Sequence, residues 1–130
     1  MGLIREYTEE DCQKIQAELR ESELIAADEY VEKVTDGDYW DMMGMSQTRG
    51  HWYFTNKQII FIGGLMGGEV VHIPVDRIKS VKKYNIRFII PTGIKVVAEN
   101  DKGKDKTYRL SVMKRENWID YITKSAKLTA

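Results

Sequence analysis

Residues 50–61 read GHWYFTNKQIIF. Two short apolar stretches, at residues 51–54 and 58–62, flank the polar segment Thr-Asn-Lys. Aromatic and β-branched side chains suit extended backbone, and a short polar connection between two such runs is typical of a β-hairpin. This stretch therefore predicts two neighbouring antiparallel strands.

The pattern of short apolar stretches separated by turn residues continues after the hairpin. Further strands are expected at residues 69–73, from 78 towards 90, at 94–99 and at 106–111. Pro74 ends the first of them because proline lacks the amide N–H that a ladder needs. Ile78 and Val81 differ in parity along the next strand, which predicts a bulge there. Turns are expected at residues 36–38, 91–93 and 100–104, where glycine, proline, asparagine and aspartate gather.

Both ends of the chain have helical patterns. Thr8 followed by three acidic residues has the form of an N-cap and first turn, and Cys12, Ile15 and Leu19 recur at helical spacing, so a helix is expected over 8–21. Residues 24–34 are ambiguous between a helical continuation and a strand, and the second half suits a strand better. Near the other end, Ser111 is a candidate for the capping region of a helix that carries Trp118 and Ile122 on its apolar face.

Composition limits the class of protein. The 130 residues are 31% charged and 42% apolar, which is enough for one core and excludes a disordered or low-complexity chain. The single cysteine, Cys12, excludes an intramolecular disulfide framework and a multi-cysteine zinc site. No apolar run reaches the roughly 18 residues that span a bilayer, and no signal peptide is evident. We therefore expect a cytoplasmic protein, one that can also be peripheral to a membrane.

About seven short strands followed by one amphipathic helix resemble the pleckstrin-homology-like superfold. Within that order, residues 50–61 look like the second and third strands of GRAM and bacterial PH-type domains. Ile73-Pro74, with Ile78 and Val81, is similar to the proline-ended fourth strand and the opening of the fifth. The resemblance covers roughly residues 24–125. It implies a mainly β domain, a seven-stranded antiparallel barrel or sandwich capped by the C-terminal helix, over 24–130. Residues 1–23 form a helical extension that the family pattern lacks.

One departure from phosphoinositide-binding relatives concerns the expected loop between the first two strands. Those relatives hold several basic residues there, whereas residues 35–45 of this chain contain three aspartates and no lysine or arginine. A phosphate head group would meet repulsion at such a loop. The resemblance therefore implies the fold without implying phosphoinositide recognition.

Signals for catalysis are weak. His51 and His72 are the only histidines, and neither stands in a recognised nucleophile motif. A buried role suits Cys12 better than a nucleophilic one, because it lies on the apolar side of its helix. We expect no enzyme, no cofactor and no metal site.

A glycine-rich segment, residues 63–68, lacks the Lys-Ser or Lys-Thr ending of a phosphate-binding loop and is expected to be a flexible hairpin tip. Its two apolar residues, Leu65 and Met66, are candidates for contact with a membrane or a partner groove.

The charge distribution is more informative than its total. Lysine and arginine number 20, as do aspartate and glutamate, yet residues 1–36 carry a net charge of −7, residues 37–76 carry −2 and residues 77–130 carry +9. A basic face is expected from one strand region, with Lys102, Lys104 and Lys106 on a nearby turn. The strand residues are Arg77, Lys79, Lys82, Lys83 and Arg87. The alternative that we favour is neutralisation, in which the acidic helix at 8–21, of the same chain or of a neighbouring copy, lies across that face.

Together these features predict a non-catalytic binding module that engages a protein partner or associates with itself as a homo-oligomer. The alternative is peripheral binding to an anionic lipid surface, through the basic strand or through Leu65 and Met66. A small enzyme ranks third, and nucleic acid is not expected as a partner.

Overall fold

The computed structural model describes residues 7–41, 45–86 and 89–128 of the chain. Its α-helices and strands, in chain order, are α1 (Glu9–Glu21), β1 (Val31–Asp41), β2 (Ser46–Thr55), β3 (Gln58–Gly63), β4 (Glu69–Pro74), β5 (Ile78–Ile86), β6 (Ile90–Glu99), β7 (Asp105–Val112) and α2 (Arg115–Ser125). Two 3-10 helices, η2 (Leu65–Gly67) and η3 (Val75–Arg77), connect strands of the second half. The predicted mainly β architecture with a helix near each end is confirmed.

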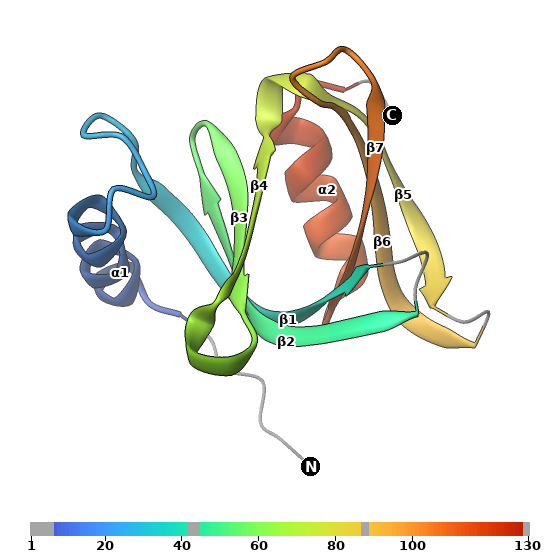
Figure 1. Ribbon diagram of the computed structural model, residues 1–130, viewed down its shortest axis with the longest axis horizontal. Helices are drawn as coiled ribbons and strands as arrows, with labels where there is room; N and C mark the ends of the chain where they lie inside the picture. Colours follow the sequence, from blue (N-terminus) through green and yellow to red (C-terminus); the bar gives the residue numbers. More distant parts are fainter. Residues whose placement is uncertain (1–6, 42–44, 87–88, 129–130) are drawn as a thin grey trace.

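The strands form one antiparallel sheet in the order β4-β3-β2-β1-β7-β6-β5, which leaves β4 and β5 as edges and does not close into a barrel. Figure 1 shows the two halves of this sheet turned towards each other around α2. The hairpin predicted at residues 51–62 is the β2–β3 pair, with Trp52 opposite Phe61. The predicted bulge is also present, because the register of β5 shifts between Ile78 and Ser80.

Helix α2 closes the main core. Trp52, Phe61 and Leu110 are fully buried on the inner face of the sheet, and Ile122 of α2 reaches the same cluster. Trp118 stacks on Phe54 with ring centroids 4.7 Å apart and an interplanar angle of 14°. An apolar helix face with an indole thus covers the inner face of the sheet, as the sequence predicted.

Helix α1 packs on the outer face of the sheet. Its Cys12 and Leu19 join Val34 and Ile60 in a second apolar cluster. Thr8 and Asp11 form a capping box at its start. Just beyond its end, the buried carboxylate of Glu29 accepts hydrogen bonds from Thr55 Oγ1 (2.5 Å), Gln58 Nε2 (2.9 Å) and the Ala26 amide (3.1 Å). The helix and its connection are therefore fastened to β1, β2 and β3.

Two predicted turns are wrong. Residues 36–38 lie inside β1, where β2 and β7 pair on both sides and supply the hydrogen bonds that a turn would otherwise provide. Gly37 is needed there for close packing, since a Cβ atom would lie 2.6 Å from the carbonyl oxygen of Ser111. Trp40, expected in a loop, also lies in β1, whereas Met42 and Met43 fall outside the described residues.

Residues 91–93 likewise lie inside β6. Pro91 stands beside the irregularity between Tyr84 and Ile86, so the ladder loses little through its missing amide N–H. The expected cap at Ser111 is wrong as well, because Ser111 belongs to β7 and α2 begins after Lys114, which has a left-handed backbone.

Candidate functional site

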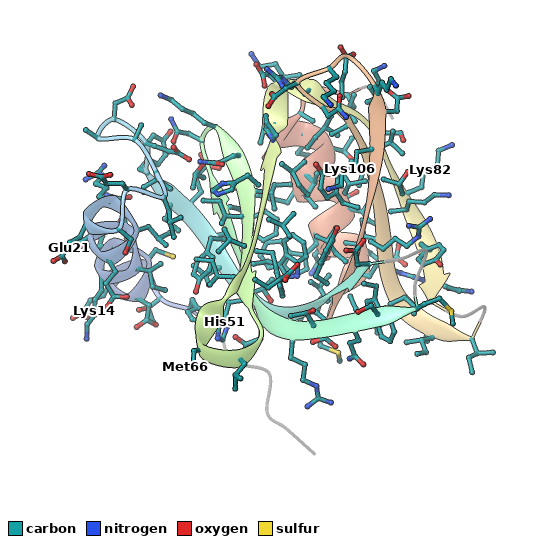
Figure 2. The ribbon with its side chains drawn as sticks, in the orientation of Figure 1. Lys14, Glu21, His51, Met66, Lys82 and Lys106 are labelled. Atoms are coloured by element: carbon teal, nitrogen blue, oxygen red, sulfur yellow. The ribbon has the colours of Figure 1, made fainter. Side chains whose placement is uncertain are left out.

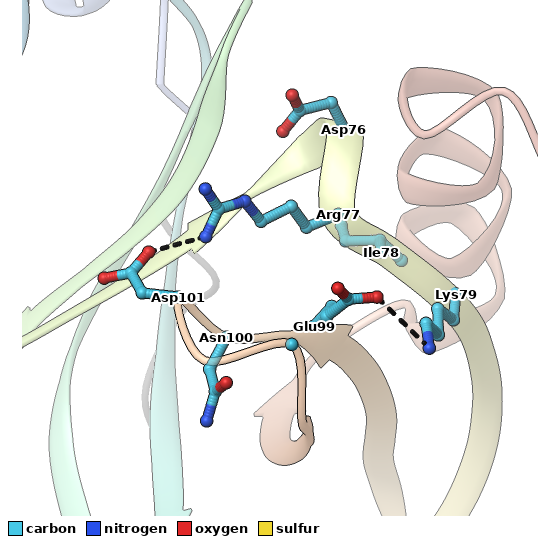
Figure 3. Close-up of a pocket in the computed structure, with 8 residues that line it drawn as sticks. Asp76, Arg77, Ile78, Lys79, Glu99, Asn100 and Asp101 are labelled. Carbon is cyan, nitrogen blue, oxygen red and sulfur yellow. Dashed lines mark hydrogen bonds and ion pairs between the residues drawn. The ribbon is translucent and has the colours of Figure 1, made fainter.

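The predicted basic strand does not form one surface. Arg77 Nη1 lies 2.6 Å from Asp101 Oδ1, and Lys79 Nζ lies 3.3 Å from Glu99 Oε2 and 2.8 Å from Asp105 Oδ1. These hydrogen bonds raise the pKa of Arg77 and of Lys79, since a neighbouring carboxylate favours the charged form. Both basic residues line an open cleft of about 500 Å³ beside the β6–β7 turn (Figure 3). Since Asp76, Glu99 and Asp101 also line this cleft, carboxylates outnumber the two cations there and the cleft does not favour an anion.

The other predicted basic residues separate further. Lys83 Nζ pairs with Glu116 Oε1 of α2 at 2.8 Å. Arg87 lies outside the described residues. Lys106 stands opposite buried Ala98 of β6, so these two side chains share a face of the sheet. Ala98 lies three residues along β6 from Lys95, and Lys106 therefore faces the side of the sheet opposite to Lys95. Of the predicted strand residues that the structure describes, Lys82 is the one without a carboxylate partner.

Lys82 instead belongs to a basic row, which we define as Lys82, Lys95 and Arg109. Lys82 of β5 stands opposite Lys95 of β6, which stands opposite Arg109 of β7, on the outer face of the sheet. The Tyr84 ring lies beneath two of these cations, 5.9 Å from Lys95 Nζ and 5.5 Å from Arg109 Cζ. Sequence reasoning missed Lys95 and Arg109, although each is flanked by two buried residues in an alternating strand, which indicates an outward position.

In the structure, the acidic helix does not neutralise the basic strand of its own chain. Helix α1 packs against β1 and its neighbours, whereas Lys82 lies on the far edge strand. Figure 2 shows Lys14 and Glu21 of α1 on one side of the molecule and Lys82 on the other. The expectation that this helix covers the basic strand of its own chain is therefore wrong. The acidic and the basic surfaces both remain exposed.

A second surface lies at one end of the sheet. Antiparallel order places the β1–β2 turn and the η2 tip at one end of their strands, and the β5–β6 turn and the β7–α2 link at the other. Figure 1 shows the η2 tip between β3 and β4. Three exposed large apolar residues lie at the first end: Met45 (69% exposed), Leu65 (91%) and Met66 (97%). We call these three the apolar end. Leu65 and Met66 were predicted as a contact tip, whereas Met45 comes from the separate β1–β2 turn.

A cluster beside α1 contains the one close histidine–carboxylate pair of the described residues. His51 Nδ1 lies 2.7 Å from Asp36 Oδ1, and the Tyr7 hydroxyl donates to the same oxygen at 2.5 Å. The cluster ties the chain before α1 to β1 and β2. His72 has a different partner, with its Nδ1 2.8 Å from Gln58 Oε1.

Two further absences concern the described residues only. Within residues 7–41, 45–86 and 89–128, no three His, Cys, Asp or Glu side chains come together as a metal site. In the same part of the chain, no helix combines the length and apolar character needed to cross a bilayer.

No family model matches the chain, and no curated protein matches it. Solved structures do. The C-terminal domain of an unknown protein from Leishmania infantum superposes with a TM-score of 0.68 at 18% identity, over 87% of this chain and 98% of that one. The DH/PH domains of PDZ-RhoGEF in complex with activated RhoA give 0.63 at 6% identity, over 85% of this chain and 32% of that one. The Vps36 N-terminal PH domain gives 0.57 at 12% identity, over 79% and 83%.

At these identities the similarity concerns the fold alone. The chain has a pleckstrin-homology-like fold, with α1 as an additional helix on the outer face. This fold commonly serves as a binding module.

Proposed function

We propose that the protein is a non-catalytic module that binds peripherally to a lipid surface through the apolar end. The observation that carries this proposal is that Met45, Leu65 and Met66 stand exposed at the same end of the sheet. Of the remaining exposed large hydrophobic residues among those that the structure describes, Val70 follows the η2 tip in β4, whereas Tyr30, Ile89 and Met113 lie at the other end.

The form of this surface favours a bilayer over a protein groove. Met45, Leu65 and Met66 are 69%, 91% and 97% exposed, so they project singly from their turns. A fluid bilayer accommodates separate projections, whereas a protein partner would need a matching hollow for each. Met66 holds a left-handed backbone (φ 57°), which is unfavourable for a non-glycine residue.

The expected affinity is modest. Removing three such side chains from water is worth about 5 kcal/mol, comparable with one myristoyl chain, whose binding constant is on the order of 10⁴ M⁻¹. Binding should therefore be reversible, and anionic lipid should strengthen it through exposed Arg49, whose carbonyl accepts a hydrogen bond from the Gly64 amide beside the η2 tip.

Sedimentation with vesicles tests this function. The wild-type chain should pellet with phosphatidylcholine–phosphatidylserine vesicles, and Leu65→Ser combined with Met66→Asn should weaken binding at least tenfold. Asparagine tolerates the left-handed backbone of Met66, so the double variant should fold. Tyr30→Ser, at the opposite end, is the matched control and should bind as wild type does. If the wild-type chain stays in the supernatant at low salt, or if the double variant pellets equally, lipid binding through this end is refuted.

Self-association is the second candidate, and the opposed acidic α1 and basic row favour it. A contact between α1 of one copy and the basic row of the next would be head-to-tail and would not close into a dimer. Exposed ion pairs contribute at most about 1 kcal/mol each, so three would hold copies together only weakly. Light scattering should show a mass that falls as salt rises, and a monomeric mass at low salt would exclude this candidate.

A further inference from the structure

The basic row is an unusual arrangement for a sheet surface. Lys82 and Lys95 stand directly opposite each other, as do Lys95 and Arg109. Neighbouring strands lie about 4.8 Å apart, so the row spans about 10 Å. Like charges directly opposite each other on a sheet are destabilising. The row therefore opposes folding unless something compensates for its charge.

The protein itself does not compensate for it within the described residues. Arg77, Lys79 and Lys83 each have a carboxylate within 3.3 Å, whereas no member of the basic row forms an ion pair there. Arg109 Nε is moreover buried without a hydrogen-bond partner among these residues. A buried N–H group without an acceptor is unfavourable, and an oxyanion at the row would supply the acceptor.

The neighbouring residues suit a compact anion. The Tyr84 ring supports Lys95 and Arg109 from one side, which limits the freedom of both cations before any ligand arrives. On the other side of the row, the next register positions are Ser80 of β5 and Thr107 of β7, which carry hydroxyl groups.

Carboxylates limit the patch at both ends along the strands. Asp38 lies two residues before Trp40, the β1 residue opposite Arg109, and it accepts a hydrogen bond from Gln47 Nε2 at 2.5 Å. Glu99 and Asp105 stand opposite each other on the far side of Thr107, where Lys79 holds them. A nucleic acid strand crossing the row would meet these carboxylates, whereas a single compact dianion would not.

We propose that the basic row binds a phosphate monoester. Such a group carries nearly two negative charges and three acceptor oxygens, enough to engage cations from neighbouring strands together. The row crosses β7, β6 and β5, whereas the η2 tip joins β3 and β4 on the far side of β1 and β2 in the sheet order, so the site is separate from Leu65 and Met66 and independent of lipid binding through them. The group can come from a phosphorylated protein side chain or from a soluble phosphorylated metabolite.

Titration followed in ¹H–¹⁵N spectra tests the site. O-Phosphoserine should shift the amides of Lys82, Lys95 and Arg109 saturably, and serine with chloride at equal ionic strength should not. A phosphoserine peptide and adenosine monophosphate form the two further arms: tighter binding of the peptide identifies a protein source, and tighter binding of the nucleotide a metabolite.

Two variants distinguish binding at the basic row from a general effect of positive charge. Lys95→Gln should weaken phosphoserine binding at least tenfold, while Lys106→Gln, with the same charge change on the opposite face, should leave it unchanged. Lys95→Gln should also melt no lower than the wild type, because it removes like-charge repulsion. The proposal is overturned if no phosphate monoester, at concentrations up to about 20 mM, shifts the amide signals of the basic row. It is also overturned if Lys106→Gln weakens binding as much as Lys95→Gln does. A third refuting outcome is that vesicles or a second copy of the chain shift these amide signals while phosphoserine does not.

Discussion

The stack between Phe54 and Trp118 should couple α2 to the sheet, and a double-mutant cycle measures that coupling. Phe54 of β2 is 1% exposed, and its ring is nearly parallel to that of Trp118 at 4.7 Å. Aromatic pairs in such offset arrangements contribute about 0.5–1.5 kcal/mol beyond the area that they bury. We expect a coupling free energy of about 1 kcal/mol between Phe54→Leu and Trp118→Leu.

Leucine at both positions keeps an apolar side chain while removing the stack, so the cycle isolates the ring contact. Urea unfolding followed by far-UV circular dichroism is the suitable assay, because it does not depend on the fluorescence of the replaced tryptophan. For a chain of this length, 1 kcal/mol corresponds to about 4 °C in Tm. Strictly additive effects of the two substitutions, within about 0.3 kcal/mol, would show that α2 is not held by this stack.

Two further predictions concern backbone conformation and pH. Glu23, with φ 61°, occupies the left-handed position of a Schellman motif, in which its amide donates to the Arg20 carbonyl and the Leu24 amide donates to the Leu19 carbonyl. Glu23→Gly should therefore raise the free energy of unfolding by about 1 kcal/mol, while Glu23→Ala should not. Equal melting temperatures of the wild type and the two variants would contradict this prediction. Burial, and to a smaller extent the charge of Asp41, raises the pKa of Tyr39 to about 12. Because the tyrosine of the unfolded chain ionises at a lower pH, near 10, the stability of the fold should decrease between pH 10 and pH 12. Tyr39→Phe should make this decrease smaller by about 2 kcal/mol, and an unchanged alkaline stability profile would contradict the prediction.

Most of the secondary structure could be predicted from local pattern. The β2–β3 hairpin, the bulge in β5 and the turn at residues 100–104 follow from alternation and turn residues, and both helices from their apolar stripes. The failures share one cause. At residues 36–38 and 91–93, turn-forming residues lie inside strands because neighbouring strands supply their hydrogen bonds and, at Gly37, need the space that a missing side chain leaves.

The candidate surfaces show the same division more sharply. Sequence reasoning found Lys82, Leu65 and Met66, but grouped Lys82 with Arg77, Lys79 and Lys83 because they are close in sequence. The structure pairs those three with carboxylates from other elements and places Lys82 beside two cations that are 13 and 27 residues away along the chain.

The sequence alone determined where both helices and most of the strands form, since the spacing of apolar and turn residues is a local property. It also determined that an acidic segment precedes a basic one. Tertiary structure decided which side of the sheet α1 covers, which cations remain without a carboxylate and which turns bring apolar residues together. Those outcomes depend on strand register and strand order, which join residues far apart in the chain and which no local pattern encodes.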